Sequence, residues 1–121
     1  MGINNGGVTM ETMKFFELRA TRQKSYYGKA NVLELQNGDK FLISYRTIVC
    51  MIDNAGTVKR FWSGCTSTTI KHINDFLMFY GVPGGGAAWW RRLPVENVRE
   101  YVKQDIEYYY TNMPKFTASY Y

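Results

Sequence analysis

The spacing of the apolar residues changes once along the chain, near residue 65. Before that point, apolar and polar residues tend to alternate, which is typical of half-buried β-strands. After it, Ile70, Ile73 and Leu77 recur at spacings of three and four, which places them on one face of a helix. A run of strands followed by helices is typical of the α+β class. We therefore expect a sheet first and helices after it.

The strands of this sheet are separated by recognisable turn sequences. The segments rich in β-branched, aromatic and alternating apolar residues are 13–20, 29–36, 41–44, 45–52 and 57–62. The Asn37-Gly38 pair predicts a hairpin with a type I′ turn, because both central positions of that turn need a positive φ. A second turn at 53–56 ends in Gly56. We expect an antiparallel β-meander of about five strands, with residues 1–12 as a flexible arm and residues 13–121 as a single domain.

The helical part begins at Thr66 or Ser67 as N-cap and reaches Gly81, a residue suited to end a helix. We expect this helix to pack against Tyr45, Ile48 and Phe61. A glycine-containing hinge at 82–86 precedes a helical turn over residues 87–93. A second helix is predicted to begin at Pro94, and its buried stripe would consist of Val95, Val98, Val102, Ile106 and Tyr109. Both helices are expected on one face of the sheet.

The charge of the chain is uneven. The 121 residues carry a net charge of +5, and residues 14–92 hold 12 lysines and arginines against 5 acidic residues. Such a surplus attracts polyanions, although it also serves solubility alone. No secretory signal and no apolar run long enough to span a bilayer is present. These features predict a cytoplasmic protein with reduced cysteines and no membrane partner.

Sequence signatures of enzymes are missing. His72 is the only histidine, and it lies about 10 Å along the expected helix from Cys65, too far for a direct hydrogen bond. We expect it to be a surface or half-buried residue. We find no phosphate-binding nucleotide motif and no metal-ligand spacing, so no catalytic residue, cofactor or metal is expected. The triplet Gly84–Gly86 either presents N–H groups to a phosphate or serves as a linker.

Cationic and aromatic residues adjoin one another in two places, Lys59–Trp62 and Trp89–Arg92. Rings of this kind stack on bases while guanidinium groups bind phosphates. Two adjacent tryptophans on a helical turn diverge by about 100°, so one of them is expected at a surface. The predicted ligand-binding residues are Arg60, Trp62, Lys71, Trp89, Trp90, Arg91 and Arg92. Burial in contacts between subunits is an equally good interpretation of these rings.

Three stretches carry a resemblance to a known group of sequences: residues 44–50 (SYRTIVC), 60–64 (RFWSG) and 66–77 (TSTTIKHINDFL). They resemble a family of small proteins, without an assigned reaction, that phages and plasmids of Gram-positive bacteria encode. Cys65 and Thr66 stand where that pattern usually has an aromatic or small residue. The resemblance implies an origin in a mobile element and a place in the cytoplasm of the bacterial host, but no chemistry.

Together these features predict a non-enzymatic binding protein. The first hypothesis is a counter-defence inhibitor that binds a phosphate-bearing ligand, either sequestering a nucleotide signal or blocking a nucleic-acid-guided nuclease of the host. The second is an accessory protein that binds single-stranded nucleic acid. The third is a module that binds only proteins. The 20 aromatic residues also predict a homodimer or higher homo-oligomer, because so many rings exceed what the core can hide.

Overall fold

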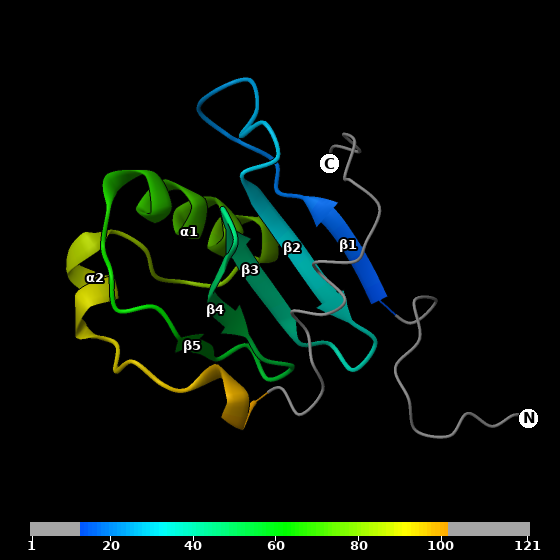
Figure 1. Ribbon diagram of the computed structural model, residues 1–121, viewed down its shortest axis with the longest axis vertical. Coiled ribbons are helices and arrows are strands. Elements are labelled where there is room, and N and C mark those ends of the chain that lie inside the picture. Colours follow the sequence, from blue (N-terminus) through cyan, green and yellow to red (C-terminus); the bar gives the residue numbers. More distant parts are fainter. Residues whose placement is uncertain (1–12, 102–121) are drawn as a thin grey trace, which may run out of the picture.

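The computed structural model describes residues 13–101, so the N-terminal arm expected at 1–12 lies outside the described residues. It confirms the α+β class: a five-stranded antiparallel sheet, in the order of the chain, precedes two helices (Figure 1). The strands are β1 (Met13–Glu17), β2 (Ala30–Leu35), β3 (Lys40–Ser44), β4 (Thr47–Ile52) and β5 (Val58–Arg60). The helices are α1 (Ser67–Tyr80) and α2 (Ala87–Arg92), and a 3₁₀ turn follows at Val98–Glu100.

The β2–β3 hairpin is present, but its turn is not of type I′. Gly38 has a φ of +100°, whereas Asn37 is not among the residues with positive φ. Gly38 N–H donates to the Leu35 carbonyl and Leu35 N–H to the Asp39 carbonyl. This is the pattern of an ordinary turn followed by a left-handed glycine, which closes a longer loop. The β4–β5 turn repeats it with Gly56, whose φ is +88°.

Both helices cover the same face of the sheet, and the main core lies between them and the strands (Figure 1). Ile73 and Leu77 of α1 belong to this core together with Val32, Leu42 and Cys50 of the sheet. A second group of buried apolar residues occupies the opposite face and consists of Leu33, Phe41, Ile43 and Met51.

Two of the three expected partners of α1 were wrong. Ile48 and Phe61 pack on the face opposite the helices. Tyr45, in the β3–β4 turn, is exposed to 48% but does contact α1, where its ring centre lies 5.9 Å from that of His72. Leu42 pairs with Cys50 while its neighbour Ile43 pairs with Ile48, so Val49 is an extra residue in β4. A bulge of this kind shifts the alternation by one, and Ile48 consequently moves to the other face.

The ends of α1 are those that the sequence predicts. Thr66 is the N-cap, and its hydroxyl accepts a hydrogen bond from Thr69 N–H. Gly81 adopts a φ of +67° at the C-terminal end, where its N–H donates to Met78 and Val82 N–H donates to Leu77. A glycine meets this left-handed geometry without the steric cost of a side chain.

The helical turn predicted over residues 87–93 is present as α2, whereas the helix predicted to begin at Pro94 does not begin there. Val95 instead forms a parallel bridge with Arg60 at the edge of the sheet, where Glu96 N–H donates to the Arg60 carbonyl. The main chain at Val95 and Glu96 therefore bonds to β5 instead of beginning a helix. Val95 is exposed, Val98 is half-buried, and the rest of the predicted stripe (Val102, Ile106 and Tyr109) lies outside the described residues. Within residues 13–101, neither helix has the length and apolar character needed to cross a membrane.

Candidate functional site

Arg60, the first of the predicted ligand-binding residues, is buried in the fold. Its Nε donates to the Trp62 carbonyl and its Nη2 to the Ser63 carbonyl, both at 2.8 Å. Its Nη1 donates to the carbonyls of Trp90 and Leu93. The guanidinium also lies 4.7 Å from the centre of the Trp90 ring. These contacts use the donors that a phosphate would need, so Arg60 joins β5 to α2.

The three tryptophans are held by the fold to different degrees. Trp90 is fully buried, and its Nε1 donates to the Gly64 carbonyl at 2.8 Å. Trp89 is half-buried, and a Cβ on Gly84 would lie 2.5 Å from its ring. Trp62 is also half-buried and lies against Gly64 in the same way. The two adjacent rings remain in contact, with centroids 6.4 Å apart. Trp90 belongs to the core, and Trp89 packs against that core from its edge.

The remaining predicted residues lie on two different elements. Arg91 and Arg92 are exposed on α2, and their side chains form no hydrogen bond or ion pair with residues 13–101. Lys71 is exposed on α1, where it lines a groove. The structure therefore divides the predicted set. Arg60 contacts Trp62 and Trp90 inside the fold, Arg91 and Arg92 are exposed on α2, and Lys71 alone of the set lines the groove.

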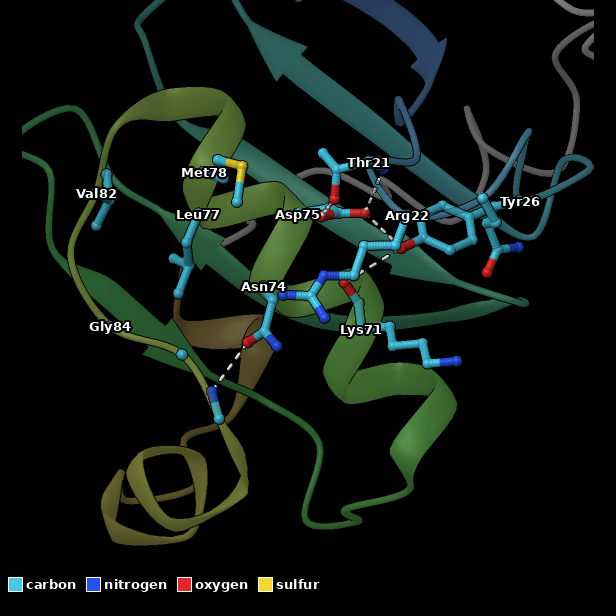
Figure 2. Close-up of a pocket in the computed structure, with 13 residues that line it drawn as sticks. Thr21, Arg22, Tyr26, Lys71, Asn74, Asp75, Leu77, Met78, Val82 and Gly84 are labelled. Atoms are coloured by element: carbon cyan, nitrogen blue, oxygen red, sulfur yellow. Dashed lines mark hydrogen bonds between the residues drawn. The ribbon is translucent and has the colours of Figure 1, made fainter.

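This groove has a volume of about 620 Å³ and lies over α1 (Figure 2). One wall is the loop between β1 and β2, and the other is the glycine-containing segment between α1 and α2. The lining residues are Thr21, Arg22, Gln23, Tyr26, Lys71, Asn74, Asp75, Leu77, Met78, Val82 and Gly84–Gly86. We call it the α1 groove.

Asp75 fastens the first wall to the helix. Its carboxylate accepts hydrogen bonds from Thr21 N–H at 3.1 Å, from the Thr21 hydroxyl at 2.5 Å and from the Tyr26 hydroxyl. Burial and the adjacent carboxylate together raise the pKa of Tyr26, which keeps its phenol protonated as a donor. The loop that carries Arg22 is thus held in place beside α1.

Asn74 fastens the second wall. Its Oδ1 accepts a hydrogen bond from Gly86 N–H at 2.9 Å, as Figure 2 shows. Gly84 and Gly85 adopt φ angles of +130° and +121°, and a Cβ on Gly85 would lie 2.8 Å from Asn74 Oδ1. Only glycine fits such a path. Within the described part of the chain, the N–H groups of Gly84 and Gly85 donate to no partner.

The α1 groove is positively charged. Arg22 and Lys71 contribute two cations against the single carboxylate of Asp75, which is buried. Neither cation forms an ion pair with another residue in the range 13–101. In addition, residues 18–29 contain four cationic residues and no acidic one. A cleft with such a surplus raises the local concentration of anions.

His72 is buried, although the sequence predicts a surface or half-buried residue. Its Nδ1 lies 2.9 Å from the Ser44 hydroxyl, and its ring contacts Tyr26 edge-on with centroids 4.5 Å apart. Burial lowers the pKa of His72 to about 4, with Asp75 opposing and Lys71 adding to the effect. The polar residues Thr69 and His72 follow the same spacing as the apolar stripe. That spacing places His72 on the buried face of α1, and Ser44 lies at the end of a strand. Together they are the sequence signal that could have predicted the buried contact between His72 and Ser44.

The buried His72 predicts a dependence of stability on pH. Its pKa is about 4 when folded and about 6.5 when unfolded, so the unfolded chain binds more protons between these values. The free energy of unfolding should therefore fall by about 2–3 kcal/mol as the pH is lowered from about 6.5 to 4. Urea unfolding at a series of pH values measures this fall.

The matched variant for this experiment is His72→Asn, which keeps a polar group near Ser44 and cannot titrate. Carboxylates titrate in both proteins, so the difference between the two curves isolates the histidine. If the variant loses as much stability as the wild type over this range, His72 is not the group responsible.

Comparison with known proteins places the sequence in a family. The model of a family of unknown function, DUF8033, matches residues 13–92. That range contains all five strands, both helices and every residue of the α1 groove. No curated protein and no solved structure gives a match to the sequence. Within residues 13–101, no group of three histidine, cysteine or acidic side chains is arranged to hold a metal ion. The chain belongs to the DUF8033 family.

Proposed function

We propose that this protein binds a small phosphate-bearing ligand in the α1 groove without transforming it. The observation that carries the proposal is that one groove is lined by Arg22, by Lys71 and by Gly84 and Gly85, whose N–H groups donate to no partner within residues 13–101. Guanidinium, ammonium and main-chain N–H groups are the donors that proteins use for phosphate. The volume of about 620 Å³ suits a ligand of nucleotide size.

The placement of the reactive side chains supports binding rather than catalysis. The imidazole of His72 is buried against Ser44 and Tyr26 and does not line the groove. Cys50 is buried in the core, and this burial raises the pKa of its thiol, which disfavours the nucleophilic thiolate. Asp75 accepts three hydrogen bonds that fix the groove wall. Its carboxylate therefore positions the loop.

The same proposal extends to the biological role. We place the protein in the cytoplasm of a bacterial host, where its resemblance to phage and plasmid proteins favours counter-defence. A protein of this kind would act by sequestering a nucleotide signal, which requires tight binding and no turnover. A groove with donors and cations but no accessible histidine suits that role.

Calorimetric titration with inorganic pyrophosphate and with ADP tests the groove directly. We expect the Arg22→Ala/Lys71→Ala variant to bind both probes at least about tenfold more weakly than the wild type, because it loses two charged phosphate contacts. The matched control is Arg91→Ala/Arg92→Ala, which removes the same charge from α2 and should bind as the wild type does. If Arg91→Ala/Arg92→Ala loses affinity instead, the ligand lies at the Trp89–Arg92 motif that the sequence predicted, and not in the α1 groove. If neither probe binds, the proposal is wrong.

A further inference from the structure

Tyr27 and Tyr45 share an uncommon backbone conformation. Their φ angles are +54° and +59°, and they are the non-glycine residues with positive φ within residues 13–101. Both are exposed, with 68% and 48% of their surface accessible. Glycine or asparagine adopts this conformation more readily than an aromatic residue does. The fold therefore carries backbone strain at two exposed positions, and such strain is typical of functional sites.

The two tyrosines lie at the same end of the sheet. Ala30 at the start of β2 pairs with Ser44 at the end of β3, so the loop before β2 and the β3–β4 turn adjoin (Figure 1). Tyr45 N–H donates to the Lys29 carbonyl at 2.7 Å, and Lys29 N–H donates to the Tyr26 carbonyl, which closes the turn that contains Tyr27. We call Tyr27 and Tyr45 the tyrosine platform.

The turn around Tyr27 is held by a buried carboxylate. Glu17 accepts hydrogen bonds from Gly28 N–H at 2.9 Å and from the Ser25 hydroxyl at 3.1 Å. The Ser25 oxygen in turn accepts from Tyr27 N–H at 2.7 Å. This network fixes the main chain at Tyr27 in its left-handed conformation, so the exposed ring projects from a rigid base.

The two loops that form the platform also carry cations. The Nζ of Lys29 lies 6.0 Å from the centre of the Tyr45 ring, and Arg46 and Lys24 belong to the same two loops. Residues 18–29 and 45–47 contain no acidic residue. Exposed rings interleaved with cations favour a polyanion whose units also carry flat, stackable groups.

The platform adjoins the α1 groove. Tyr26, the residue before Tyr27, lines the groove, and its hydroxyl lies 3.4 Å from the Lys71 carbonyl. Figure 2 shows Tyr26, Arg22 and Lys71 around one end of the groove. A ligand with one phosphate in the groove can thus continue outwards over the loop that carries Tyr27.

We infer that the ligand is a short single-stranded oligonucleotide, with a phosphate held by Arg22 and Lys71 and the following bases stacked on Tyr27 and Tyr45. The inference rests on the proposed function for the position of the phosphate. Stacking accounts for the strained aromatic residues, because a base has a flat face whatever its sequence. Binding should therefore depend weakly on sequence and steeply on salt.

The test compares two probes on the same variants. Fluorescence anisotropy measures the affinity for fluorescein-labelled dT8, and calorimetry measures the affinity for inorganic pyrophosphate. Tyr27→Gly/Tyr45→Gly removes both rings and relieves the backbone strain, although it also removes the contact of the Tyr45 ring with His72. Its circular dichroism spectrum and melting temperature are therefore measured first, to establish that the variant is folded at the temperature of the binding experiment. We expect it to bind dT8 about a hundredfold more weakly, about tenfold for each ring. Its affinity for pyrophosphate should not change.

Tyr27→Phe/Tyr45→Phe is the matched control, because it keeps both rings and should bind dT8 about as well as the wild type. If the glycine variant binds dT8 as tightly as the wild type, the inference is overturned while pyrophosphate binding still supports the groove. If dT8 binding needs the tyrosines but Arg22→Ala/Lys71→Ala binds it normally, the inferred phosphate position is overturned. The proposed function fails as well only if that variant also binds pyrophosphate as tightly as the wild type does.

Discussion

Replacing Trp90 with alanine should lower the free energy of unfolding by about 3–5 kcal/mol, whereas the same change at Trp89 should lower it by far less. Trp90 has no exposed surface, and its indole donates to the Gly64 carbonyl. Its removal leaves a cavity under α2 and an unpaired acceptor. Trp89 is half-buried, so water can occupy part of the space that its ring leaves.

Urea unfolding followed by circular dichroism measures both variants, because fluorescence would change with the loss of either tryptophan. Trp90→Phe is a control that keeps a ring in the core and should recover part of the loss. A role of Trp90 in subunit contacts predicts a different result. In that case the variant would keep the stability of the monomer and lose self-association in light scattering.

The strand order was predictable because the turns and the alternation agree with one another. Gly38 and Gly56 mark the two hairpins, and the change of period marks α1. The bulge at Val49 was not predictable, since an inserted residue in an apolar strand leaves the composition of that strand unchanged. Its consequence is that Ile48 faces away from the helices, which no local pattern shows.

The candidate site was predictable only in part, and for a similar reason. Lys71 and the three glycines are visible in the sequence as an exposed cation and a phosphate-binding or linker segment. Arg22 and Tyr27 lie in a loop without periodicity, and a tertiary contact to Asp75 brings that loop to α1. Long-range contacts of this kind leave no spacing signal.

The motif of adjacent arginine and tryptophan has two physical outcomes that look alike in a sequence. When the ring is exposed, the guanidinium above it is accessible to a ligand. When the ring is buried, the guanidinium instead donates its hydrogen bonds to groups of the same protein. Arg60 and Trp90 are 30 residues apart and form the second arrangement, with the guanidinium 4.7 Å from the ring centre. Burial therefore decides the role of the pair.

Replacing Arg60 with methionine should lower the free energy of unfolding by about 3–5 kcal/mol, because it leaves several carbonyls inside the fold without a donor. Methionine fills much of the volume of the arginine stem but donates no hydrogen bond. The carbonyls of Ser63, Trp90 and Leu93 would then lose their donor. An acceptor left buried and unpaired costs about 1–3 kcal/mol. Arg60→Lys should recover little, because an ammonium group does not reproduce the planar fork of the guanidinium.

Because Arg60 and Trp90 contact each other directly, their variants should not be additive. In a double-mutant cycle, Arg60→Met combined with Trp90→Ala should cost less than the sum of the single changes, by about 0.5–3 kcal/mol. A matched cycle between Arg60→Met and Leu33→Ala, which lies on the opposite face of the sheet, should be additive within about 0.5 kcal/mol. If the Arg60–Trp90 cycle is equally additive, the guanidinium does not hold α2 against β5. Arg60 would then again be a candidate for binding the ligand. A phosphate site at β5, on the edge of the sheet, would have to be considered beside the one in the α1 groove.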